Sequence, residues 1–329
     1  MPLSDNSKFG IKALTQAVNT IEPVPTQIRD LGIFTPQYLT TTYVDVENRN
    51  GVLQLVQSKE RGVAGAPVSD KTRTVRTFRI PHLPVNDVVR ADDVQNVRAF
   101  GGTQAETVQE KVTDKLADAK NNLEMTREHL MLGALCGKIL DADGSELYNI
   151  YNEFGLTRKT YDWALDTTTT EVGAVIDKTL AEQRAKLKGA YVTGWVALCG
   201  IDFLAALKYH ESIKHMYERY RDGAAYREGN GINPIEFEHN GIKFIHYTGD
   251  FGNKAAKIKP EEAILLPVGN KLYAEFFAPG DMNETVNTKA LPYYATREKL
   301  RHDLGWSLRA QSNPLPLVLR PELVATLTV

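Results

Sequence analysis

The sequence predicts an α+β fold, and three features of its hydrophobic pattern support this class. Residues 103–140 carry an apolar stripe with helical spacing over an unusual length. Short β-rich runs, bounded by Gly, Pro or Asn-Gly, occupy most of the remaining chain. Helices and strands do not alternate regularly, which argues against a parallel nucleotide-binding sheet.

The composition is that of an ordinary globular protein. The 329 residues are 42% hydrophobic and 24% charged, with a formal net charge of −2, so we expect one large or two medium domains. This charge argues against nucleic-acid binding over the whole surface, which needs a cationic excess. The longest apolar run, 195–207, is too short to cross a bilayer, so we expect no membrane association.

The two cysteines, Cys136 and Cys199, have no CxxC spacing and lie in apolar stretches. The sequence also shows no secretory leader. We therefore expect a reducing compartment, with both thiols buried and unreactive.

The N-terminal part of the chain predicts extended structure. Residues 1–42 are interrupted by prolines and show a helical pattern only around Ile11–Val18, so we interpret them as an arm outside the core. Residues 40–56 hold two β-rich runs around an Asn-Arg-Asn-Gly turn, and a Gly-rich polar tip follows at 57–71. A basic strand, 71–79, returns from the tip. An isolated hairpin is only marginally stable in water, so we expect this one to lie on another surface.

The strongest predicted element is a helix over residues 103–140. Thr103 and Glu106 have the T-x-x-E spacing of a capping box. One apolar stripe follows at steps of 3, 4 or 7, formed by Val108, Val112, Leu116, Ala119, Leu123 and Leu130. Such a helix is roughly 50 Å long at 1.5 Å per residue.

The remaining elements follow from local patterns. They are a hairpin at 137–155, a helix at 171–188, a buried strand at 190–199, a helix at 201–221, a Gly-rich loop at 222–234, a hairpin at 235–249 turning at Asn240-Gly241, strands at 263–269 and 272–281, and a strand-rich stretch from 304 to 329.

The sequence shows no catalytic, cofactor-binding or metal-binding signature. His210 and His215 resemble a zinc-protease motif, but their i, i+5 spacing places the two rings on different faces of a helix. The stretch from Asp141 resembles a calcium loop, but Asn152 stands at the twelfth position, where that loop needs Glu. We therefore predict no enzyme and no cofactor.

The stretch from Phe78 to Gly102, FRIPHLPVNDVVRADDVQNVRAFGG, resembles the phage major capsid protein E family of lambda-like tailed phages. The matching positions are Ile80, Pro81, Pro84, Asp87, Asp93, Val94, Gln95, Val97, Arg98, Ala99, Phe100 and Gly101. The order of elements also agrees from about residue 40 onward. The resemblance implies the Hong Kong 97-type capsid fold.

In that fold we expect five parts. They are an N-terminal arm at 1–42, an E-loop hairpin at 43–100, a P-domain at 101–189 with the spine helix 103–140, an A-domain at 190–290, and C-terminal strands at 291–329 that return toward the P-domain.

The resemblance also implies a function, that of a major capsid protein which self-assembles into the icosahedral head of a tailed double-stranded DNA phage. Expected partners are other copies of the chain in hexamers and pentamers, a scaffolding protein, a portal protein and, as an open alternative, a decoration protein. Because no long charged helical region precedes the arm, we expect the scaffold on a separate polypeptide. The shell is expected to assemble in the host cytoplasm and to enclose DNA without binding particular sequences.

Two charged sets are candidate contacts between subunits. The basic strand supplies Lys71, Arg73, Arg76 and Arg79, and the long helix supplies an i, i+4 row of Glu106, Glu110, Asp114 and Asp118. On a strand, Lys71, Arg73 and Arg79 share one face. The row is explained if a neighbour's basic strand lies across it. The alternative is that Lys111 and Lys115 offset the row within the helix.

Three other functions remain open at this stage. A nucleic-acid-binding protein would use the cations of 71–79 on phosphates, but that function predicts further basic clusters. A cellular compartment shell of the encapsulin type shares the implied fold. An enzyme of unrecognised type would need a pocket with perturbed titratable groups.

Overall fold

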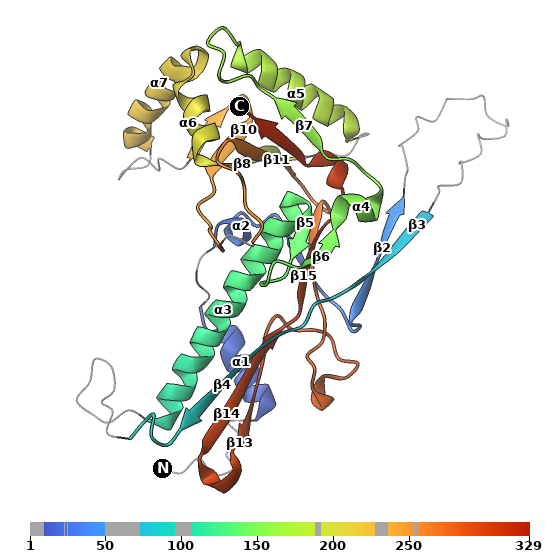
Figure 1. The fold of residues 1–329 in the computed structure, drawn as a ribbon, viewed down its shortest axis with the longest axis vertical. Helices are drawn as coiled ribbons and strands as arrows, with labels where there is room; N and C mark the ends of the chain where they lie inside the picture. Colours follow the sequence, from blue (N-terminus) through green and yellow to red (C-terminus); the bar gives the residue numbers. More distant parts are fainter. Residues whose placement is uncertain are drawn as a thin grey trace, which may run out of the picture. The chain divides into compact units, whose positions relative to one another are not determined.

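The computed structural model describes residues 10–22, 24, 26–49, 73–95, 107–187, 192–227, 236–252 and 255–329 (Figure 1). It confirms the α+β class. The chain divides into two compact units, each built from three separate stretches. The first unit comprises 1–44, 77–131 and 274–317, and the second comprises 45–76, 132–273 and 318–329. The expected boundaries of the E-loop, P-domain and A-domain stay predictions.

The first unit is organised by α3 (Val108–Cys136), whose residues up to Met131 belong to it. An antiparallel sheet of β13 (Tyr294–Lys299), β14 (Gly305–Ser312) and β4 (Leu83–Arg90) shares a core with this helix. The buried core residues are Leu14, Val18, Val89, Val112, Leu116, Ala119, Leu123, Tyr293, Ala295, Leu308 and Ala310. The predicted apolar stripe of the long helix is therefore its core-facing side.

The N-terminal residues contribute to this core, which corrects our interpretation of 1–42 as an arm outside it. Two helices form here, α1 (Ile11–Thr20) and α2 (Gln27–Asp30). Leu14, Val18 and Ile28 are buried in the first unit. Leu14 and Val18 are four residues apart, so they share one face of α1 and both meet the core. The weak pattern around Ile11–Val18 was the signal of this helix.

A second sheet of the first unit joins three strands from distant parts of the chain. β12 (Tyr273–Phe277) lies between β1 (Thr35–Tyr38) and β15 (Pro314–Val318). β1 runs parallel to β12, with Pro36 opposite Glu275. The strand predicted at 272–281 is confirmed with shorter bounds.

The predicted two-stranded excursion is present where the structure describes it. β2 (Tyr43–Arg49) pairs with β3 (Arg73–Arg79) in a sheet of these two strands. The Asn50-Gly51 step and the whole tip at 57–71 lie outside the described residues. The start of the basic strand at Lys71 lies outside them as well.

The long helix is shorter than we predicted. Thr103 and Glu106 lie outside the described residues, and α3 begins at Val108 with a different T-x-x-E capping box, in which Glu110 N donates to Thr107 Oγ1 and Thr107 N donates to Glu110 Oε2. α3 ends at Cys136 instead of residue 140. Gly137 follows with φ of +93°, a conformation that glycine adopts readily and that terminates helices.

The predicted hairpin after the helix forms over fewer residues than expected. β5 (Lys138–Leu140) pairs with β6 (Glu146–Asn149). The expectation that this hairpin continues to residue 155 is wrong, because α4 (Ile150–Phe154) follows directly. The Asn149 side chain accepts from Asn152 N and so caps α4.

The second unit is built on a six-stranded sheet. Its order is β7 (Lys159–Asp162), β16 (Ala325–Thr328), β11 (Glu262–Val268), β8 (Gly194–Cys199), β10 (Ile242–His246) and β9 (Glu236–His239). Among the described strands, β7 pairs with β16 alone, and the two strands are parallel. The predicted Asn240-Gly241 turn joins β9 to β10 with positive φ at both residues, as a type I′ turn requires.

Helices α5 (Val172–Lys186), α6 (Ile201–Tyr209) and α7 (Glu211–Arg227) lie over this sheet in Figure 1. The prediction of one helix over 201–221 is wrong, because His210 adopts an extended conformation between α6 and α7. Its ring Nδ1 accepts from Ser212 N, and its Nε2 lies 3.0 Å from Thr167 O. His210 is therefore buried at the start of α7 and its ring is used as a cap.

Trp163 connects the sheet of the second unit to its helices. Its side chain is fully buried, and its ring contacts Phe203 of α6 and Phe244 of β10. Its Nε1 donates to Thr179 Oγ1 of α5. One indole thus fixes three elements around the sheet.

The structure also contains short 3-10 turns at Asn283–Thr285, Arg301–Asp303 and Pro321–Leu323. Over the described part of the chain, none of the helices combines the length and apolar character needed to span a membrane.

Candidate assembly surfaces and a buried charge cluster

The described side chains of the predicted basic strand alternate between its two faces. The exposed positions are Val75, Thr77 and Arg79, and the buried ones are Phe78 and Ile80. This is the alternation that we expected from the sequence. Lys71 lies outside the described residues, and Arg73 is placed in β3 by its backbone.

Arg76 lies on the opposite face of β3 and has partners within the second unit. Its guanidinium is 3.7 Å from a carboxylate oxygen of Glu153 and 5.8 Å from the centre of the Phe154 ring. A partly exposed ion pair of this kind contributes about 0–1 kcal/mol. Arg76 is therefore already engaged in a contact within its own chain.

The described members of the acidic row, Glu110, Asp114 and Asp118, are exposed on α3. They lie on the side of the helix opposite the buried stripe of Val112 and Leu116. Glu106 lies outside the described residues. Hydrogen bonds from the backbone N and hydroxyl of Thr107 lower the pKa of Glu110, so this residue also has a structural role. Asp114 and Asp118 are thus the better probes of an intersubunit contact.

One of the two lysines that could offset this row has another partner. Lys115 Nζ donates to Asp87 Oδ1 of β4 at 2.8 Å. Burial opposes ionisation of Asp87, but the hydrogen bonds from Lys115 and Val88 N outweigh it, and the pKa of Asp87 is lowered. The explanation in which Lys115 neutralises its neighbours on the helix therefore loses support.

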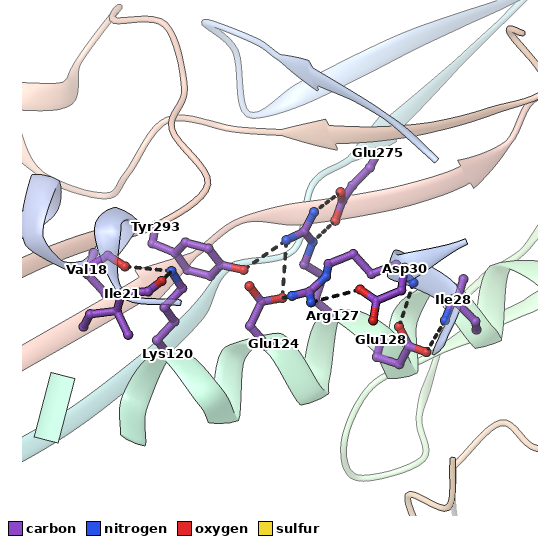
Figure 2. A network of polar contacts seen from close by, with 11 residues as sticks. Val18, Ile21, Ile28, Asp30, Lys120, Glu124, Arg127, Glu128, Glu275 and Tyr293 are labelled. Atoms are coloured by element: carbon purple, nitrogen blue, oxygen red, sulfur yellow. Dashed lines mark hydrogen bonds and ion pairs between the residues drawn. The ribbon is translucent and has the colours of Figure 1, made fainter. Parts of the chain in front are cut away.

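The most elaborate polar arrangement among the described residues is a buried charge cluster of the first unit, formed by Arg127, Glu275, Glu124, Arg29 and Tyr293 (Figure 2). Arg127 of α3 donates through Nε and Nη2 to the two carboxylate oxygens of Glu275 on β12. Its Nη1 donates to the Tyr293 hydroxyl at 3.1 Å and to Glu124 Oε2 at 3.4 Å. Arg29 of α2 reaches the same Glu124 oxygen at 3.2 Å.

The electrostatics of the cluster follow from burial and from Arg127. Glu275 is 1% exposed, and burial raises its pKa although the Arg127 hydrogen bonds oppose this shift. Burial likewise raises the pKa of Tyr293. Burial disfavours the charged form of Arg127, but Glu275 outweighs that effect and the guanidinium pKa is raised. The cluster can therefore position charged side chains, but it contains no nucleophile or open metal position.

This cluster was not predicted from the sequence, although one signal was present. The apolar stripe of the long helix steps by seven from Leu123 to Leu130, and Arg127 occupies the skipped position. A charged residue within a buried stripe indicates a buried partner. The partner itself, Glu275, lies in a strand that otherwise looked wholly apolar.

The described residues contain no group of three or more His, Cys, Asp or Glu that could hold a metal ion. His215 is exposed on α7 and His210 is buried, so the two do not form a zinc site. Cys199 is buried as expected, whereas Cys136 is only partly so. Burial raises the pKa of both thiols, that of Cys136 to about 11, so neither is activated.

A sequence profile described as phage major capsid protein E matches residues 10–329. The chain belongs to the phage major capsid protein E family. Two curated relatives align with this chain over most of their lengths. The major capsid protein of Pseudomonas phage KPP10 is 27% identical, covering 97% of this chain and 96% of the relative. That of Salmonella phage Felix O1 is 25% identical, covering 98% and 96%.

Solved structures show the same fold for this capsid protein. The putative capsid protein of a prophage of E. coli CFT073 aligns with a TM-score of 0.57 at 13% identity, over 98% of this chain and 99% of the other. The mature capsid of bacteriophage PhiM1 aligns with a TM-score of 0.51 at 11% identity, over 93% and 87%. These matches confirm the Hong Kong 97-like capsid fold.

The family decides between the functions left open by the sequence. The chain is a structural protein of the phage virion, a component of its capsid, and not an enzyme. The basic strand 71–79 consequently belongs to a capsid protein and needs no separate function in nucleic-acid binding.

Proposed function

We propose that many copies of this capsid protein assemble into the icosahedral head shell of a tailed double-stranded DNA phage. The observation that carries the proposal is the family match over residues 10–329, joined to a capsid fold along the same stretch. The β2–β3 ribbon supports it, because a sheet of two strands is marginal in isolation and gains stability by lying on a neighbour.

The proposal includes partners besides the chain itself. A separate scaffolding protein guides assembly of hexamers and pentamers, a portal protein occupies one vertex, and a decoration protein remains an open alternative. The shell encloses DNA without strong binding. The formal net charge of −2 supports this part, because phosphate binding grows with the number of cations presented.

Expression with and without the scaffolding protein tests the proposal. We expect particles of uniform diameter by negative-stain microscopy when the scaffold is present, and capsomers or irregular shells without it. Sedimentation as a compact monomer at every protein concentration and ionic strength, with scaffold supplied, contradicts the proposal.

We also propose a specific contact, in which β3 of one subunit lies across the acidic row of α3 in the next. The exposed basic position Arg79 and the exposed carboxylates of Asp114 and Asp118 support it through opposite charge. Each exposed pair contributes only about 0–1 kcal/mol, so the repeated match along both elements supplies the specificity.

Charge reversal tests this contact. Arg73→Glu with Arg79→Glu is expected to reduce the yield of shells, and adding Asp114→Lys with Asp118→Lys is expected to restore part of it. Glu110 is left unchanged because its carboxylate accepts from Thr107 N in the capping box of α3. The control adds Asp250→Lys and Glu261→Lys, two exposed acidic positions of the second unit, to the same arginine variant. Equal yields from the two combined variants contradict the contact.

A further inference from the structure

The two N-terminal helices of the first unit lack side-chain caps of their own. α1 follows Gly10 without a side-chain cap and has no basic residue in its last turn. α2 spans four residues, and Thr26 before it makes no capping hydrogen bond. Isolated helices shorter than ~12–15 residues are marginal in water. Neither helix is therefore expected to persist by itself.

The C-terminal end of α1 is capped by Lys120, a residue of α3 (Figure 2). Lys120 Nζ donates to Val18 O at 2.9 Å and also to Ile21 O. A cation at this end of a helix interacts favourably with the helix dipole. Lys120 is 2% exposed, and burial lowers its pKa. The buried ammonium group is thus satisfied by the carbonyl groups of α1 and of the residue that follows it.

The N-terminal end of α2 is capped by Glu128, also of α3 (Figure 2). Its carboxylate accepts from Ile28 N at 2.7 Å and from Arg29 N at 3.2 Å. Glu128 is 4% exposed. A negative charge at a helix N-terminus is favourable for the same electrostatic reason. Between these two caps, Glu124 pairs with Arg29, so residues 120, 124 and 128 form one charged face along two turns of α3.

The apolar packing of α1 is narrow by comparison. Leu14 and Val18 are buried, and the Thr15 hydroxyl exchanges hydrogen bonds with the backbone of Ala295. A groove of about 570 Å³ opens between α1 and α3, and its lining combines apolar residues such as Ala17 and Leu116 with polar ones such as Thr113. A second groove, of about 490 Å³, lies on the side of α1 that faces residues 284–294. α1 therefore packs through a narrow strip of residues and has a groove on each side.

We propose that residues 10–30 form a detachable segment that is helical only while it is docked on the charged face of α3. Since α3 provides the missing caps of both helices, undocking removes the caps and the helices unfold in the same event. The segment then opens at a lower free energy than the rest of the first unit, as local units of a fold do. This inference concerns the single chain and does not depend on the proposed shell.

Hydrogen exchange of the full-length chain, followed by mass spectrometry, tests the proposal. In the unmodified protein, amides of α1 and α2 are expected to exchange faster than those of α3 at 118–131. Lys120→Met and Glu128→Gln keep the side-chain size, so the fold of the unit is retained. Each variant is expected to raise exchange in both α1 and α2 by roughly tenfold, the factor that one lost helix cap produces.

The decisive observation is the cross-effect. Glu128 caps α2, yet Glu128→Gln must also accelerate exchange in α1 if the segment opens as one body. The controls are Lys111→Met and Asp118→Asn, which make the same types of change on α3 outside the charged face. They are expected to leave hydrogen exchange in residues 10–30 unchanged. Acceleration confined to the helix whose cap was removed overturns the proposal. So does loss of protection in α3 together with the segment.

Discussion

The two units solve the packing of their helices by different means. In the second unit, Trp163 joins the sheet to α5 and α6 through aromatic contacts and one hydrogen bond. In the first unit, the face of α3 that receives α1 and α2 carries Lys120, Glu124 and Glu128. A buried aromatic contact loses most stability when a substitution leaves a cavity. A buried ion pair loses most stability when one partner is removed, because the other charge is left uncompensated. The extent of burial alone therefore does not indicate which kind of substitution will destabilise a region.

The largest expected effect comes from removing the indole at the centre of the second unit. Trp163→Ala is expected to cost about 4 kcal/mol, because it deletes a fully buried aromatic side chain and leaves a cavity. Since whole domains are stable by about 5–15 kcal/mol, this change unfolds much of the unit in mild urea. Circular dichroism and fluorescence during urea titration measure it.

Trp306→Ala is the control, because that ring is only partly buried and lies under Arg297 on the β13–β14 sheet. We expect it to cost less than half as much. Equal losses of stability for the two variants would contradict the role of Trp163 as the main packing contact of the second unit.

An intermediate effect is expected at Arg127. Arg127→Met leaves Glu275 and Glu124 without their shared guanidinium and is expected to cost about 3 kcal/mol. Glu275→Gln is expected to cost less than Arg127→Met, because Glu124 remains beside the Arg127 guanidinium as a counter-charge. Urea titration of both variants gives the difference. A larger loss in Glu275→Gln than in Arg127→Met would reverse our account of the cluster.

The smallest effect is a difference in pH dependence between two carboxyl groups of the first unit. The folded-state pKa of Glu275 is raised, so the folded chain takes up this proton before the unfolded chain does. Its contribution to stability therefore becomes more favourable as the pH falls from 7 toward 4.5. The folded-state pKa of Asp87 is lowered, so its contribution is present above 3.8 and is lost as the pH falls further.

Urea titrations between pH 7 and pH 4 measure this difference. The free energy of unfolding of the unmodified chain, minus that of the Glu275→Gln variant, is expected to increase as the pH falls. The gap to Asp87→Asn stays constant over the same range. A gap to Glu275→Gln that narrows on acidification would contradict the assigned direction of the Glu275 pKa.

Elements whose signal is local were predictable from the sequence. The Asn240-Gly241 turn and the stripe of α3 depend on residues within a few positions of one another, and both are confirmed. The fold itself followed from the resemblance around Phe78–Gly102. The break at His210 was not predictable, because its ring is held by Thr167, 43 residues earlier in the chain.

The charged face of α3 was missed for the same reason. Lys120, Glu124 and Glu128 looked like ordinary surface residues of an amphipathic helix, because their partners lie about 100 residues away in a segment interpreted as an arm. For the acidic row, the described positions were predicted correctly but the contact is not tested. Its residues are where the sequence placed them, but their contact requires a second chain, so a single chain cannot test it.

The parallel pairing of β7 with β16, its one partner among the described strands, has a consequence for biosynthesis. β7 ends at Asp162 and β16 begins at Ala325, so the ribosome adds roughly 160 residues before β7 can find its partner. At about 5–20 residues per second, this takes roughly 8–30 s. During that interval β7 is an unpaired edge on a nascent polypeptide, which is the kind of segment that aggregates with other chains unless it is protected.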